Sequence, residues 1–276
     1  MDLKIIDNHM HLNPFTGRYL EAVETFSRAG GKVLMVTTMA YKKIPLTPED
    51  YRDEYSTTVR IVENINNKTD VRAYAVIGSY PVNLIHMLDK MDIARASEIM
   101  KKGMDIASEF IRDGKAIGIG EIGWPHFEIS NEMKKVSLSI FEYGVGISKD
   151  LDVPVIIHGP HLNIDDFEYL SSVIQKTGLK KDRIVKHYAT PDHNMNYDIV
   201  PSYLAKKDSV KKIINQEPPF FLETDYMDDV ERPGAVLDIA TVPKRIKWLI
   251  NNKITTEEHL NDLFNLSIKK VYGIEI

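Results

Sequence analysis

Short apolar runs rich in β-branched residues alternate along the chain with longer segments in which apolar residues recur every three or four positions. The runs predict eight strands, over residues 3–7, 32–39, 71–78, 116–123, 153–159, 183–188, 198–205 and 219–226. The helical spacing covers residues 20–29, 49–66, 82–112, 131–149, 163–177, 208–216 and 236–251. Several runs are almost continuously apolar, which is typical of strands that are covered on both faces.

This alternation predicts an α/β protein, a TIM (β/α)8 barrel that forms a single domain over residues 1–276. The length agrees, because such barrels take about 250 residues. One connection is unusual: roughly ten residues separate the sixth and seventh runs, which is too short for a full crossover helix. A doubly wound open sheet is the alternative, since the number of strands does not show whether the sheet closes.

Composition and charge narrow the classes of function. The chain has no cysteine, which excludes disulfides and thiolate metal sites. Its start lacks the long apolar core of a signal peptide, and no apolar run approaches the roughly 18 residues of a membrane span. We therefore expect a cytoplasmic protein without a membrane partner. The net charge of −5 means that the surface as a whole does not attract nucleic acid.

Polar residues of metal-binding type stand where the apolar runs end. The first run is followed by two histidines one residue apart, and four later runs also end in a histidine or a carboxylate. These residues are His9, His11, Glu121, His158, His187 and Asp225. Taken singly, each could be an ordinary hydrogen-bonded polar group at a strand end. Together they predict one site, because the carboxyl ends of the strands meet at one face of a barrel.

The donor types set the chemistry of that site. Imidazole nitrogen and carboxylate oxygen without sulfur favour zinc, manganese, iron or magnesium. Four histidines and two carboxylates are enough for two divalent ions. Asp7 and Glu223 are candidates for orienting an imidazole from behind, and Gly118 and Gly120 would let a bridging carboxylate come close.

Several segments of the sequence, taken together, resemble those of a known family. The segments IIDNHMHL, IGEIG, VPVIIHG and FLETD, with His187 in the sixth run, are similar in order and spacing to those of TatD-type metal-dependent hydrolases of the amidohydrolase superfamily. The segment HLNDLFNLSIKKVYGI resembles the closing helix of the family. The resemblance implies a TIM barrel with one or two metals, and the best-known members of the family are deoxyribonucleases.

The resemblance also implies roles for the six residues. His9, His11 and Asp225 would hold one ion, while His158 and His187 would hold the other. Glu121 would bridge the two ions, and Asp225 would shuttle a proton from a metal-activated hydroxide. Zinc is the first choice for both ions, with magnesium or manganese as alternatives.

The loops depart from the family pattern. Nucleases of the family usually have Leu-Asp after the fourth strand, where this chain has Trp124-Pro125, and Ser-Pro after the final aspartate, where it has Tyr226-Met227. The segments GPH and YATPDHN also differ from the Ser-Arg and Cys-Phe-Ser-Gly of the family. We therefore expect a divergent member. Candidate substrate contacts in these loops are Trp124, His126, His161, Tyr188, His193 and Tyr226.

Three functions are compatible with these residues. The first is hydrolysis of a small-molecule or nucleic-acid phosphoester, with a deoxyribonuclease as one form of it. The second is hydrolysis of a small lactone, amide or carboxylic ester by the same machinery. The third is a non-catalytic barrel that binds metal. The lysine doublets are spread over helical segments rather than gathered at the loops, so the sequence does not show the basic mouth expected of a DNA-binding enzyme.

Overall fold

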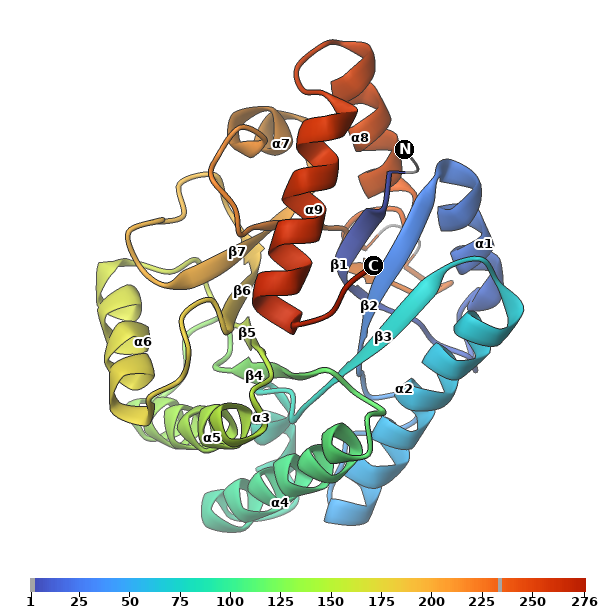
Figure 1. Cartoon of the computed structure of the whole chain (residues 1–276). Helices are drawn as coiled ribbons and strands as arrows, with labels where there is room; N and C mark the ends of the chain where they lie inside the picture. The colour runs from blue at the N-terminus through green and yellow to red at the C-terminus, as the bar shows by residue number, and fades with distance from the viewer. Residues whose placement is uncertain (1–2, 233–234) are drawn as a thin grey trace.

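The structure, a computed structural model, describes residues 3–232 and 235–276. Its centre is one parallel sheet that curls into a barrel, and helices surround it on the outside (Figure 1). The strands are β1 (Ile5–His11), β2 (Gly31–Thr37), β3 (Arg72–Ile77), β4 (Gly118–Gly123), β5 (Val155–His158), β6 (Ile184–Ala189), β7 (Ile199–Leu204), β8 (Phe221–Glu223) and β9 (Tyr226–Met227).

The helices mostly follow the strands one by one. They are α1 (Leu20–Ala29), α2 (Pro48–Lys68), α3 (Asn83–Met87), α4 (Ile93–Arg112), α5 (Asn131–Leu151), α6 (Ile164–Thr177), α7 (Lys207–Ile213), α8 (Thr241–Asn251) and α9 (Glu257–Tyr272). Local sequence motifs determine where several of these helices begin. At α2, for example, Thr47 and Asp50 form a capping box and Pro48 occupies the first helical position. In the described part of the chain, no helix is long and apolar enough to cross a membrane.

The eighth strand closes the barrel, which confirms the TIM-barrel prediction over the open sheet. Its first half, β8, pairs with β7, and its second half, β9, pairs with β1. Thr224 and Asp225 interrupt it between the two halves, and the backbone N–H of Asp225 donates to the carbonyl oxygen of His9 at 3.0 Å. The eight predicted runs therefore correspond to the eight barrel strands, with the last one divided by a kink.

Three predicted elements illustrate how the bounds differ from those in the structure. Residues 82–112 form two helices rather than one, because the side chain of Asp92 accepts from the backbone N–H of Arg95 and begins α4 there. The last predicted helix of 236–251 begins only at Thr241, after a turn in which Asp238 accepts from the N–H of Ala240. The first strand extends past residue 7 to His11, since its polar residues continue the ladder.

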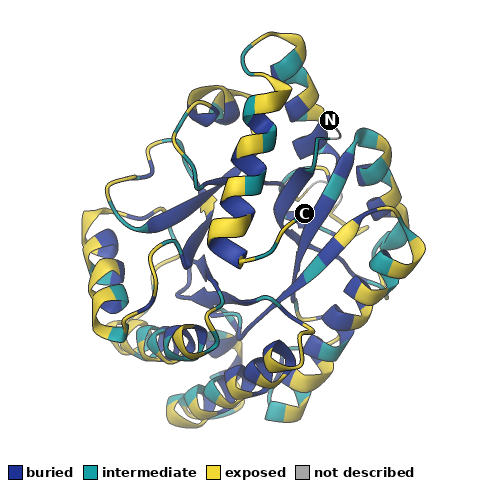
Figure 2. Ribbon diagram, viewed as in Figure 1, coloured by how far each residue is buried: buried dark blue, intermediate teal, exposed yellow. Residues whose placement is uncertain are grey.

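Burial follows the layers of the barrel. The strands are buried along nearly their whole length, whereas the helices show exposed residues on their outer faces (Figure 2). The short connection between β6 and β7 contains no helix in residues 190–198, all of them described, as its length predicts. The polar residues at the carboxyl ends of β1, β4, β5 and β6 are buried as well. This placement sets the chemistry of the site.

Candidate functional site

The six predicted ligands lie together at the carboxyl face of the barrel. His9 and His11 point to the same side of β1, and their Nε2 atoms are 3.2 Å apart. Within the described residues, three overlapping groups place one ligand atom from each member within 4.8 Å of the others. These groups are His9, His187 and Asp225; His9, His11 and Glu121; and Glu121, His158 and His187.

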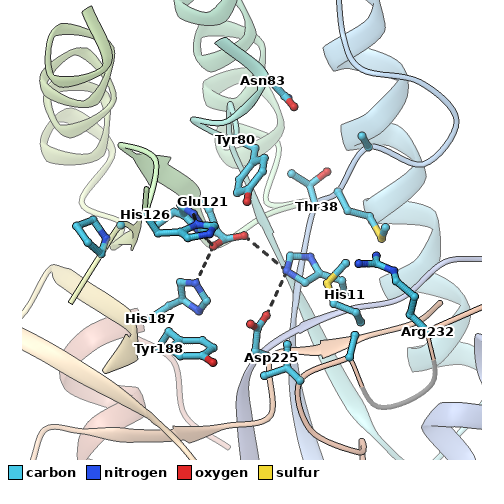
Figure 3. Close-up of a pocket in the computed structure, with 18 of the residues that line it drawn as sticks. His11, Thr38, Tyr80, Asn83, Glu121, His126, His187, Tyr188, Asp225 and Arg232 are labelled. Carbon is cyan, nitrogen blue, oxygen red and sulfur yellow. Dashed lines mark hydrogen bonds and ion pairs between the residues drawn. The ribbon is translucent and has the colours of Figure 1, made fainter. Parts of the chain in front are cut away.

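Glu121 stands at the centre of this cluster and faces both halves of it. Its Oε1 atom is 3.0 Å from Nδ1 of His158 and 2.9 Å from Nε2 of His187. Its Oε2 atom is 3.7 Å from Nε2 of His9 and 3.6 Å from Nε2 of His11. Each carboxylate oxygen therefore faces a different pair of imidazoles, as in a carboxylate that bridges two cations, and Figure 3 shows Glu121 between His187 and His11.

The spacing on the β1 side suits a tetrahedral ion. Oδ1 of Asp225 lies 3.8 Å from Nε2 of His9 and 3.7 Å from Nε2 of His11. Bonds of about 2.1 Å in a tetrahedron place the donor atoms roughly 3.4 Å apart. The distances from His9 and His11 to each other, to Glu121 and to Asp225 bracket that value, so the two imidazoles with either carboxylate have the spacing of ligands to one zinc-like cation.

Neighbouring groups fix the orientation of the imidazoles. Nδ1 of His187 is 3.1 Å from Oε1 of Glu223, and Nδ1 of His11 is 3.1 Å from the carbonyl oxygen of Thr37. An acceptor on the far nitrogen places the proton there and leaves Nε2 free as a donor to a metal. Glu223 therefore has the contact expected of it. Asp7 instead accepts from the backbone N–H groups of Thr224 and His9, so it holds the strands and not an imidazole.

The electrostatics of the cluster favour a bound cation. Burial alone would raise the pKa of Glu121, but the imidazoles of His187, His9 and His158 hold it well below its usual range. Burial would lower the pKa of His187, yet Glu121 and Glu223 raise it to about 10. Burial and the nearby His9 lower the pKa of His11 to about 4, which keeps its imidazole neutral. The carboxylates of Glu121 and Glu223 therefore favour a positive charge at this place.

Asp225 owes its position to an uncommon backbone conformation. Its φ of 48° lies in the left-handed region, which costs a non-glycine residue on the order of 1 kcal/mol or more. This kink separates β8 from β9 and turns the carboxylate toward His9 and His11. Burial raises the pKa of Asp225 to about 6. The chain thus places, at some conformational cost, a carboxylate that can hold or release a proton near neutral pH.

A cavity of about 830 Å³ opens above the six residues. The side over β4, β5 and β6 is rich in imidazoles, from His126, His158, His161 and His187, and Figure 3 shows His126, His187 and Tyr188 there. The other side carries apolar residues of the loops after β2 and β9, beside His11, Thr38 and Arg232. The size is that of a pocket for a small molecule.

The structure divides the predicted substrate contacts into two sets of three. His126, His161 and Tyr188 line the cavity, and Nδ1 of His126 is 3.1 Å from Nε2 of His158. Trp124, His193 and Tyr226 are buried in the packing around the cavity instead.

Each residue of the second set has its own structural role. Trp124 packs edge-on against Phe141, with ring centroids 6.0 Å apart. His193 has its Nε2 atom 2.9 Å from the carbonyl oxygen of Ile199, and Tyr226 donates its hydroxyl to Asp228. These three side chains are buried in the core and do not line the cavity, so their contact with substrate stays a prediction.

Several residues at the site were not predicted from the sequence. Tyr80, Asn83 and His86 reach the cavity from the segment after β3, and Arg232 reaches it from the loop after β9. These loop positions have no periodicity that would mark them. Lys186 is buried one residue before His187, and its ammonium donates to the carbonyl oxygens of Gly159 and His187, which links the ends of β5 and β6. A lysine beside a ligand histidine in an apolar run was a signal that could have found it.

Comparison with known proteins supports this description. Residues 6–273 match the family model described as TatD related DNase. An uncharacterized protein of Methanocaldococcus jannaschii is 31% identical over 284 residues, covering 99% of this chain and 97% of that protein.

Solved structures share the fold at low identity. A TatD homologue of Escherichia coli has a TM-score of 0.68 at 17% identity, with 99% of this chain and 100% of that chain covered. An organophosphorus hydrolase of Deinococcus radiodurans has a TM-score of 0.59 at 12% identity, with 98% and 93% covered. The match over nearly the whole chain shows that this protein belongs to the TatD-related DNase family of hydrolases.

Proposed function

We propose that this hydrolase cleaves phosphoester bonds with two divalent cations, zinc being the first choice and magnesium or manganese the alternatives. The observation that carries the proposal is the division of Glu121, with one carboxylate oxygen facing His158 and His187 and the other facing His9 and His11. A carboxylate with imidazoles on both sides is the donor set of a two-metal hydrolase.

The residues of the site have different roles in this reaction. Bound divalent cations would polarise the phosphoryl oxygen and lower the pKa of water from 15.7 to about 7. Asp225 accepts the proton of the attacking water and delivers it to the oxygen of the leaving group. Glu121 and the four histidines hold the cations in place.

The phosphoester assignment rests on the family and on one structural relative. The family is described as DNases, and a relative of similar fold is named for organophosphorus hydrolysis. Both descriptions concern cleavage at phosphorus. The same machinery would hydrolyse a lactone, an amide or a carboxylic ester, so the assignment needs a direct test.

The test is hydrolysis of bis(p-nitrophenyl) phosphate by the purified protein, with p-nitrophenyl acetate and a small lactone measured alongside. We expect turnover of the phosphodiester that a chelator abolishes, that added zinc restores and that Asp225→Asn reduces by about 10²–10⁴-fold. The variant Asp105→Asn is the matched control, because that carboxylate lies on α4 and binds Tyr143. Turnover of the acetate or lactone alone would move the function to carbonyl chemistry. Bound metal without any turnover would indicate a non-catalytic barrel.

A further inference from the structure

The wall of the cavity opposite the imidazoles has a composition that the reaction does not require. It is built by residues 38–47 after β2 and by residues 228–232 and 235–240 after β9, together with the end of β9 itself. Its apolar members are Met39, Ala40, Ile44, Met227, Ala235 and Val236, which we call the apolar wall. Because β2 and β9 flank β1, the apolar wall rises directly beside His11.

Few lysine or arginine side chains line the cavity. Among the described residues that line the cavity, Arg232 is the one lysine or arginine, and its Nε atom already donates to Asp229 at 2.6 Å. Lys43 lies nearby in sequence to the wall and pairs with Asp50 at 2.6 Å. A nucleic-acid strand presents a series of phosphates, and proteins bind such a strand through several lysine and arginine contacts. One guanidinium matches a ligand with one anionic group.

Exposed apolar side chains also lie on the face of the barrel that carries the cavity. Of the eight large apolar side chains exposed in the described residues, five lie in the segments that follow β1, β4, β5, β6 and β9, and these are Phe15, Phe127, Ile164, Met195 and Val230. Tyr188, in β6, lines the cavity itself. Exposed apolar groups scattered over a surface need no explanation, but a concentration on one face indicates a binding function.

We propose that the substrate is a small phosphoester that carries an apolar group, and that the apolar wall binds this group while the phosphoryl centre lies over Glu121 and Asp225. This inference rests on the proposed function and names its substrate class. A cavity of about 830 Å³ holds a phosphoryl group together with an alkyl chain or an aromatic ring. Single-stranded DNA would instead need a row of cations along its path.

The test uses p-nitrophenyl phosphodiesters that share one leaving group and one charge and differ only in the second substituent. Methyl, butyl and hexyl esters are compared with the thymidine 5′ ester and with an oligothymidylate strand. Burial of each methylene in the wall is expected to raise kcat/KM by about two- to fourfold. The hexyl ester should then exceed the methyl ester by about 30-fold or more and the thymidine ester by about tenfold or more.

A matched pair of variants locates the effect. Ile44→Asn places a polar group in the apolar wall and should reduce the hexyl-to-methyl ratio by about fivefold or more. Leu266→Asn makes the same kind of change at an exposed position on α9 and should leave the ratio unchanged. Metal content and circular dichroism of both variants show that each is folded.

The outcomes separate this inference from the proposed function. Hydrolysis of the esters without dependence on chain length, or preference for the thymidine ester or the oligothymidylate, would overturn the apolar substrate and leave the phosphoesterase intact. The same ratio in Ile44→Asn as in the unchanged protein would also overturn it. Hydrolysis of none of these esters by the metal-loaded protein would overturn both proposals.

Discussion

Glu121 and Glu54 are buried to nearly the same degree, with 5% and 7% of each residue exposed, yet their surroundings are opposite. Glu121 lies among four imidazoles at the carboxyl ends of the strands, and they hold its pKa well below the usual range against the effect of burial. Glu54 lies on α2, and its Oε1 atom has no hydrogen-bond partner in the part of the chain that the structure describes. Burial and the nearby Asp50 raise the pKa of Glu54 to about 9.

The comparison shows that burial of a charged residue does not by itself mark a functional site. Burial and Asp50 favour the protonated form of Glu54, and no described cationic group lowers its pKa, whereas Glu121 lies among histidines that could bind a metal and that also face Asp225. Convergence of donors from β1, β4, β5, β6 and the kink after β8 is therefore the property that points to catalysis. The same Glu→Gln substitution at the two positions should therefore have different effects.

The largest effect is expected for Glu121→Gln. The amide has nearly the same shape but lacks the negative charge between the two groups of imidazoles, so metal binding and activity should fall together. We expect kcat/KM on bis(p-nitrophenyl) phosphate to drop by about 10³-fold or more. The matched Glu54→Gln variant should keep its activity. Equal activity in Glu121→Gln and the unchanged protein would remove the distinction between the two sites.

A smaller effect is expected for Glu223→Gln, which acts through His187. The variant replaces the carboxylate that orients Nδ1 of His187 at 3.1 Å, so the affinity for the metal facing His187 should fall by about 10–100-fold. Titration of the metal-free protein with zinc measures this change. Glu98→Gln, an exposed substitution on α4, is the control and should bind zinc normally. Unchanged affinity in Glu223→Gln would mean that His187 is not a ligand.

The effect of Glu54→Gln should appear in stability and depend on pH. The folded-state pKa of Glu54, about 9, lies above its ordinary value of 4.5, so the folded state binds more protons between these values. The unchanged protein therefore loses stability as the pH rises through this interval. Glu54→Gln removes that loss, and its free energy of unfolding should exceed that of the unchanged protein by on the order of 5 kcal/mol at pH 9 and by little at pH 4.5. Urea unfolding at pH 4.5, 7 and 9 measures the difference, and a difference independent of pH would show that Glu54 is not a buried neutral acid.

The smallest effect is expected for Trp124→Phe. Trp124 packs against Phe141 and Tyr169 behind the cavity, so a smaller ring should cost about 1–2 kcal/mol of stability. KM should stay within about twofold of its original value, since the residue does not face the substrate. A large rise in KM with normal stability would instead return Trp124 to the binding site, as its place in the sequence first suggested.

The sequence predicted the barrel and the placement of the six ligand residues because both depend on simple periodicity. Residues two apart on a strand share a side, and parallel strands end at one face, so His9, His11 and Glu121 could be brought together before any coordinates. Loop residues follow no such periodicity, so the sequence does not show which of them face the cavity. Trp124 and His126 are two residues apart, yet one is in the core and the other in the cavity wall, because the packing of α5 and α6 decides between them.

The most direct test of the central claim is the metal content of the protein. We predict that the purified chain, after removal of metal by a chelator and reloading with excess zinc, retains about two equivalents of zinc per chain through desalting. Its Tm should rise on reloading, because ligands that bind the folded state stabilise it. Elemental mass spectrometry measures the zinc content of the unchanged protein and of the Glu121→Gln variant. Retention of no metal, with the same Tm before and after zinc, would contradict the account.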